Sequence, residues 1–134
     1  MIHLDTSFAV DLLREIARKR HGPAQTFLEA HAEESVGISL FAVCELFMGA
    51  ELSSRPALEL ERIRSFCSHL HIDFPNERFA PAFAKNYARQ EKLGRRMATM
   101  DLLIATSAIL ADAPLVTRDV TDFARITGLK SIGY

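Results

Sequence analysis

Short apolar runs alternate along the chain with longer stretches in which apolar residues recur every three or four positions. The short runs predict strands at residues 2–4, 36–38, 70–74, 114–117 and 131–134. The longer stretches predict helices at residues 8–22, 23–28, 40–52, 58–66, 76–94 and 99–111, and residues 119–125 form a turn or short helix. This alternation predicts an α/β fold, with a parallel sheet of four to five strands and helices on both faces.

Three details of this pattern concern the helices. Ser39 is expected to cap the helix that follows it, and Gly94 to end the longest one. Within that longest helix, Phe79, Phe83 and Tyr87 recur at every fourth position, so all three are expected to face inward.

The composition is typical of one folded domain spanning residues 1–134. The chain is 49% hydrophobic and 25% charged, and its length allows roughly 65–70% of the unfolded surface to be buried. Cys44 and Cys67 lie singly in apolar segments, so both are predicted to be reduced core residues. No apolar run approaches the roughly 18–20 residues that span a bilayer, and Asp5 stands where a signal peptide needs apolar residues. We expect a cytoplasmic protein without membrane contact.

Four acidic residues lie against apolar runs, whereas most others have charged neighbours: Asp5, Glu45, Asp101 and Asp119. Each has a local explanation. Asp5 and Asp119 are placed to cap a helix or a turn, and Asp101 lies in the first turn of a predicted helix. Glu45 shares a predicted helix face with Ala42 and Met48, where a buried ion pair with an arginine would explain it. An unpaired carboxylate on a buried face costs several kcal/mol, so each must be paired, protonated or given a cation.

The predicted sheet offers a shared explanation for these acids. Strand carboxyl ends and the following helix starts lie along one edge of a parallel sheet, where ligands bind. Asp5 and Asp119 follow strands directly, while Glu45 and Asp101 reach the same place only if the pocket dips between helices. Four clustered carboxylates repel one another unless divalent cations are present, and oxygen-only ligands suit Mg²⁺ or Mn²⁺. A two-metal site for phosphoryl chemistry is therefore expected.

At these residues the sequence resembles the PIN-domain ribonucleases, specifically the VapC-type toxins of bacterial toxin–antitoxin pairs. The resemblance rests on Ile2-His3-Leu4-Asp5-Thr6-Ser7, Glu45-Leu46 with Gly49-Ala50, Asp101-Leu102-Leu103-Ile104-Ala105, and Thr117-Arg118-Asp119 with Phe123 and Gly128-Leu129. It implies a PIN fold, in which Asp5, Glu45, Asp101 and Asp119 are the catalytic, metal-binding acids. It also places Ser7 and Thr117 at the hydroxyl positions beside them. The fourth acidic position is often Asn in such proteins, and Asp119 leaves the acidic set complete here.

The same resemblance implies a substrate and partners. The substrate is a structured RNA such as a tRNA or rRNA loop, and the partners are a VapB-type antitoxin and a second copy of the chain. The net charge is −1, so phosphate contacts require local cations, for which Arg95 and Arg96 just before the Asp101 helix are the first candidates and residues 18–20 the second. A partner-facing patch at Phe41, Phe47, Met48 and Leu52 competes with simple core packing.

Several alternatives stay open. A Mg²⁺-dependent receiver or phosphatase-like domain also gathers acids at strand ends, although the phosphatase pattern has a second Asp where this chain has Ser7. A catalytically idle protein that binds an antitoxin or a DNA-bound complex is the alternative from a different class. The five histidines suggest acid–base chemistry or a metal site at His69 and His71, but they form no recognisable catalytic arrangement. Asp122 is an optional fifth acid outside the main site.

Overall fold

A computed structural model describes residues 1–134 and contains five strands in one sheet. The strands are β1 (Ile2–Leu4), β2 (Val36–Ser39), β3 (His71–Asp73), β4 (Leu115–Val116) and β5 (Ser131–Ile132). The helices are α1 (Thr6–Arg18), α2 (Pro23–Ala30), α3 (Leu40–Glu51), α4 (Pro56–Cys67), α5 (Phe79–Lys92), α6 (Thr99–Leu110) and α7 (Val120–Phe123). The predicted α/β fold is confirmed.

The sheet is parallel throughout, with the strand order β3-β2-β1-β4-β5. The central strand is β1, the first in the sequence. Its partners are β2, with Leu4 opposite Ile38, and β4, with Leu4 opposite Val116. Because the register aligns the carboxyl ends of these strands, the residues that follow β1 and β4 emerge side by side at one edge of the sheet.

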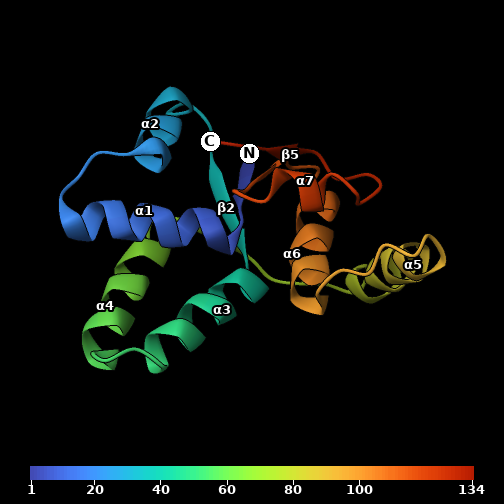
Figure 1. Cartoon of the computed structure of the whole chain (residues 1–134), viewed down its shortest axis with the longest axis horizontal. Coiled ribbons are helices and arrows are strands. Elements are labelled where there is room, and N and C mark those ends of the chain that lie inside the picture. The colour runs from blue at the N-terminus through green and yellow to red at the C-terminus, as the bar shows by residue number, and fades with distance from the viewer.

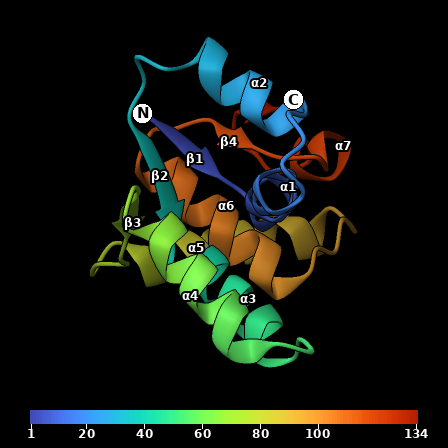
Figure 2. The same ribbon diagram turned by 90° about the vertical axis from the view of Figure 1, so that its left-hand side faces the viewer.

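Helices cover both faces of the sheet. Figure 1 shows α1 and α2 on one side of the strands and α5 and α6 on the other. One cluster of 7 buried residues packs α1 and α2 against the sheet through Phe8, Phe27 and their neighbours. A larger cluster of 15 joins α3, α4 and α6 to Ile38 and Leu115. The hairpin of α3 and α4 lies beyond the end of β2 (Figure 2).

The predicted helix ends are confirmed where a side chain or glycine fixes them. The Ser39 hydroxyl accepts a hydrogen bond from the Ala42 amide at 3.1 Å, and Gly94 follows α5 with a left-handed φ of 65°. The start of α5 differs from the prediction, because the Asn76 side chain accepts from the Arg78 amide at 2.9 Å and holds a turn there. The helix therefore begins at Phe79 and not at residue 76.

Two predictions about buried residues are wrong. Tyr87 is 45% exposed, because two steps of four residues rotate a side chain by about 80° around a helix relative to Phe79. Cys44 is exposed although α3 is apolar nearly all round, since Val43 and Leu46 take the core-facing positions. Only Cys67 is a core thiol, and burial raises its pKa. No helix is both long and apolar enough to cross a membrane.

Candidate metal centre

Asp5 is held at the centre of the sheet edge. It follows β1 directly, its amide donates to the Val116 carbonyl at 3.0 Å, and its side chain is 4% exposed. Its carboxylate does not cap α1, which it precedes. Instead, one oxygen, Oδ2, accepts from both the Ser7 and Thr117 hydroxyls at 2.8 Å, and Oδ1 has no hydrogen bond. The helix-cap explanation is therefore wrong for Asp5.

The two predicted hydroxyl positions lie together beside Asp5, although Ser7 is in α1 and Thr117 follows β4. The oxygens of the two hydroxyls are 3.4 Å apart. Because each hydroxyl has one proton and donates it to Asp5, each is left to accept from the backbone. Ser7 accepts from the Arg118 amide at 3.2 Å, and Thr117 accepts from the Asp119 amide at 3.0 Å. The hydroxyls thus tie the segment that carries Asp119 to Asp5.

Glu45 approaches from α3. Its carboxylate accepts a hydrogen bond from the Thr6 hydroxyl at 2.6 Å, which joins the second turn of α3 to the first residue of α1. No arginine pairs with Glu45, so the ion-pair explanation is not supported. The predicted face with Met48 is wrong as well, because Met48 is exposed while Ala42 is buried. Sequence reasoning also missed Thr6 as the partner of Glu45.

Asp101 lies half-buried in the first turn of α6. Burial and neighbouring negative charge raise its pKa from 3.8 to about 6. The contributing charges, after burial, are those of Asp5, Glu45, Asp119 and Asp122. Negative charge near a partly desolvated carboxyl favours its protonated form. The charges of Asp5, Glu45 and Asp119 therefore all act on Asp101, and so does that of Asp122.

The donor set fits a hard divalent cation. All contributing groups are oxygens, the hydroxyls fix the orientation of Asp5, and the crowded negative charge is the kind that Mg²⁺ or Mn²⁺ relieves. In this conformation no group of three or more His, Cys, Asp or Glu side chains is close enough to surround one ion. His69 Nδ1, of the alternative site at His69 and His71, lies 2.8 Å from the Ser65 carbonyl oxygen.

The candidate basic residues lie in two separate parts of the chain. Arg95 and Arg96 are exposed in the connection between α5 and α6, and Arg96 makes only a loose pair with Glu91 at 3.5 Å. Residues 18–20 lie at the far end of the 13-residue helix α1, about 20 Å along its axis from Asp5. Arg95 and Arg96 precede α6, the helix that carries Asp101.

The largest cavity of the molecule is not at the acids. It measures about 1030 Å³ and is lined by apolar residues of α1, α2 and α4 together with polar ones such as Glu61, Arg62 and His69. A second cavity of about 440 Å³ lies between α1, α3 and α4, with Glu45 among its lining residues. In the predicted apolar patch, Met48 and Leu52 are exposed, whereas Phe41 and Phe47 pack against the core. The patch is therefore smaller than predicted.

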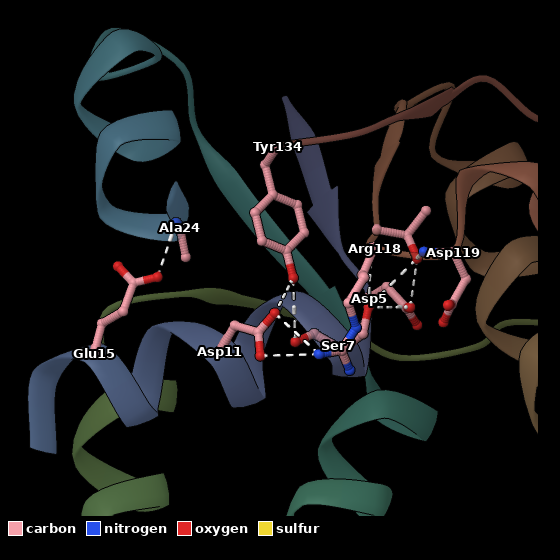
Figure 3. A network of polar contacts seen from close by, with 9 residues as sticks. Asp5, Ser7, Asp11, Glu15, Ala24, Arg118, Asp119 and Tyr134 are labelled. Atoms are coloured by element: carbon pink, nitrogen blue, oxygen red, sulfur yellow. Dashed lines mark hydrogen bonds and ion pairs between the residues drawn. The ribbon is translucent and has the colours of Figure 1, made fainter. Parts of the chain in front are cut away.

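Asp11, Arg118 and Tyr134 form a network of polar contacts that sequence reasoning missed. Arg118 Nη1 contacts the two carboxylate oxygens of Asp11 at 3.2 and 3.3 Å, and the Tyr134 hydroxyl donates to Asp11 Oδ2 at 2.5 Å (Figure 3). The partners are more than 100 residues apart in the sequence, so no local pattern indicates them. His3, the nearest histidine to Asp5 in the chain, is buried, and neither of its ring nitrogens makes a hydrogen bond. Its Nε2 lies 3.9 Å from Asp73 Oδ2, and burial lowers its pKa.

Comparison with known proteins connects this arrangement to a family. The family model described as PIN domain matches residues 2–129. The chain belongs to the PIN-domain family. The resemblance found in the sequence is thereby confirmed, and the acids, hydroxyls and Arg118 all fall within the matched PIN-domain region.

Individual relatives agree with this membership. The PIN-domain chain is 30% identical over 93 residues to Ribonuclease VapC1 of Haemophilus influenzae strain R2866, with 69% of each chain covered. It is also 30% identical over 94 residues to Ribonuclease VapC2 of Haemophilus influenzae strain ATCC 51907, covering 70% of this chain and 71% of the relative.

Solved structures share the whole fold. A chain of VapBC2 from Rickettsia felis, bound to a DNA fragment from its promoter, matches with a TM-score of 0.90 at 26% identity, covering 100% of this chain and 99% of the other. A chain of VapBC-1 from nontypeable Haemophilus influenzae matches with a TM-score of 0.85 at 25% identity, covering 99% and 98%. The five-stranded PIN fold is therefore common to all three.

Proposed function

We propose that the protein is a metal-dependent endoribonuclease and the toxin of a VapBC-type pair. The observation that carries the proposal is that acids from separate parts of the chain act on one another's site: burial and the charges of Asp5, Glu45 and Asp119 raise the pKa of Asp101. Gathering like charges lowers the stability of the folded protein, and a site for cations explains why the protein nevertheless has this arrangement. Relatives named Ribonuclease VapC support hydrolysis of RNA.

The metal would be Mg²⁺ or Mn²⁺, held by Asp5, Glu45, Asp101 and Asp119. When bound, two such ions supply an activated water and stabilise the leaving oxygen of a phosphodiester. Ser7 and Thr117 keep one oxygen of Asp5 occupied and leave Oδ1 to face the ions. Attack of water at phosphorus on this face leaves 5′-phosphate and 3′-hydroxyl ends.

The proposed partners follow from the relatives. Similar chains occur in VapBC complexes, one of them bound to promoter DNA. We propose that this protein is neutralised by a VapB-type antitoxin and forms a homodimer. The alternative, a catalytically inactive binding protein, would have the same partners but would not cleave RNA, so a cleavage assay distinguishes the two hypotheses.

The test uses protein free of antitoxin, total cellular RNA and Mg²⁺ or Mn²⁺, with sequencing of the new ends. We expect discrete cuts that EDTA abolishes and that Asp5→Asn and Asp101→Asn slow by at least about 100-fold, since even the partners of metal ligands are worth about 10–100-fold. The matched control is Asp112→Asn, because Asp112 is exposed in a left-handed turn that Asn also adopts.

Each other outcome changes the proposal. Metal binding without cleavage would favour the idle binding protein. Cleavage that survives EDTA would exclude a metal mechanism and return attention to the histidines. Equal losses in Asp112→Asn and the site variants would show that the losses come from the general reduction in charge.

We also propose that Arg95 and Arg96 contact RNA phosphates. Because both side chains are exposed and only loosely paired, changing both to Ala should leave the fold and kcat unchanged and raise KM several-fold. The slope of log affinity against log salt should fall by about 0.7 for each lost contact to single-stranded RNA. The double substitution Arg18→Ala and Lys19→Ala at the far end of α1 serves as the control. If both double substitutions weaken RNA binding equally, binding depends on the overall positive charge of the surface and not on specific contacts of Arg95 and Arg96.

A further inference from the structure

The segment that carries Asp119 is fastened to α1 twice. The first fastening is made by the hydroxyls of Ser7 and Thr117, already described beside Asp5. The second is the contact of the Arg118 side chain with Asp11, one turn further along α1 than Ser7. Both fastenings cross from the end of β4 to α1, so they fix the position of the β4–α7 connection relative to the helix that begins beside Asp5.

Tyr134 completes the second fastening from a third part of the chain. Its ring packs edge-on against Phe8 with ring centroids 4.6 Å apart, which directs the hydroxyl toward α1. The hydroxyl donates to Asp11 and also lies 3.5 Å from the Ser7 carbonyl oxygen (Figure 3). Asp11 thus receives the phenol and the guanidinium together while its side chain is only 23% exposed.

Arg118 has two roles in this arrangement. Its side chain contacts Asp11, and its backbone amide donates to the Ser7 hydroxyl, which in turn donates to Asp5. A shift of Arg118 therefore changes the hydrogen bond that the Ser7 hydroxyl accepts, and it moves Asp119, the next residue in the chain, at the same time. A chain of contacts runs without a gap from Tyr134 through Asp11 and Arg118 to Asp5.

We propose that Tyr134, Asp11 and Arg118 form a positioning clamp that sets the spacing of Asp5 and Asp119 and so the affinity of the site for divalent metal. The proposal rests on the proposed function, because it takes Asp5 and Asp119 as metal ligands. The clamp residues touch neither metal nor RNA. They act through Ser7 and through the backbone of residues 118–119.

The test measures the Kd for Mn²⁺ from the electron paramagnetic resonance signal of the free ion, with no RNA present. Outer partners of metal ligands are worth about 10–100-fold in affinity, and Tyr134 is one contact further out, so Tyr134→Phe should weaken Mn²⁺ binding about 3- to 10-fold. Phe retains the packing on Phe8 and removes only the hydroxyl. Tyr87→Phe, the same change at the other tyrosine of the chain, should leave the Kd unchanged, since Tyr87 is exposed on α5.

A second variant checks that the residues act as one unit. Asp11→Asn should weaken Mn²⁺ binding at least as much as Tyr134→Phe, and the double variant should be no weaker than Asp11→Asn alone, because both changes break one network. Thermal unfolding of each variant shows that the measured protein is folded at the assay temperature.

The outcomes separate this proposal from the proposed function. If wild-type protein binds Mn²⁺ and the folded variants bind it equally well, the clamp is wrong and the proposed function stands. If Asp11→Asn raises KM for RNA without changing the Kd for Mn²⁺, Arg118 acts on RNA and the clamp is again wrong. If wild-type protein binds no Mn²⁺, both proposals fail, because the clamp has no metal site to position.

Discussion

Two regions of the site, Asp5 at the edge of the sheet and Asp101 on α6, differ in how their carboxylates are held. Asp5 is buried in the middle of the sheet edge, and two hydroxyls orient its carboxylate. Asp101, on α6, is half-buried among like charges, and no hydrogen bond contributes to its raised pKa. Glu45 is intermediate, with a single hydrogen bond from Thr6.

The comparison shows how one site combines rigidity with a need for cations. The Asp5 side is preorganised, because hydrogen bonds set its geometry before any ion arrives. The Asp101 side stores unfavourable electrostatic free energy, which a divalent cation releases. Substitutions on the first side should therefore change how well ions are held, whereas substitutions on the second should also change the stability of the metal-free protein.

Among substitutions that leave the four acids in place, the largest effect is expected at Thr117, on the preorganised side. Thr117→Val keeps the shape of a fully buried side chain and removes the hydroxyl that contacts both Asp5 and the Asp119 amide. Affinity for Mn²⁺ and the rate of RNA cleavage should each fall about 10–100-fold. The measurement is a metal titration followed by cleavage at saturating metal.

The conservative variant Thr117→Ser sharpens this test. It restores the hydroxyl and should recover most of the metal affinity, although it loses a buried methyl group. If Thr117→Val binds metal as well as the wild-type protein, the hydroxyl does not orient Asp5 and the contrast between the two sides disappears.

A medium effect is expected when cations are added. Wild-type protein should gain about 1.4 kcal/mol in free energy of unfolding at a Mg²⁺ or Mn²⁺ concentration ten times the Kd, because the ion binds the folded state. Asp101→Asn should gain much less at the same concentration, since it has lost a ligand. Chemical denaturation with and without metal measures both gains. Equal gains would place the ion away from Asp101.

The smallest effect is expected at Asp101 in metal-free protein. The pKa is about 6 in the folded state and 3.8 as an ordinary value, so the folded state holds the proton more tightly. Stability therefore falls as pH rises from about 4 to about 6 and stays lower above that range. Asp101→Asn cannot ionise and should stabilise the metal-free protein at pH 7.5 by about 1 kcal/mol, after the full shift is reduced for partial exposure to solvent.

The pH dependence checks the origin of that gain. Repeated near pH 4.5, the same comparison should give a smaller gain, because wild-type Asp101 is then largely protonated in the folded state. Asp112→Asn should show no gain at either pH. A gain in Asp101→Asn that does not change with pH would come from helix propensity or packing and not from charge.

Much of the fold could be predicted because it depends on local patterns. The strands are short apolar runs, and Ser39 and Gly94 have local effects on the helices that they flank. The four acids stood out because each interrupts an apolar stretch. The parallel order of strands then predicted that Asp5 and Asp119 share one edge, which Glu45 and Asp101 reach only if the pocket dips between helices. The charges of the other three acids, after burial, raise the pKa of Asp101, which supports this prediction.

The remainder depends on contacts between distant residues. Thr6 contacts Glu45 across 39 positions, and Tyr134 contacts Asp11 across 123, so neither pair leaves a periodic signal. Tyr87 was misplaced because a repeat of four drifts around a helix with 3.6 residues per turn. Cys44 was misplaced because apolar surroundings in the sequence do not show which side of an apolar helix meets the core.

The central position of β1 has a consequence for synthesis of the chain. The strand is made first, but its neighbour β4 and the Thr117 hydroxyl are made 112 residues after Asp5. At translation rates of about 5–20 residues per second, the first acid waits several seconds for the last one to emerge. A nascent chain therefore carries no assembled acidic site, and the ribosome that makes it is not exposed to a working nuclease until synthesis has passed Asp119.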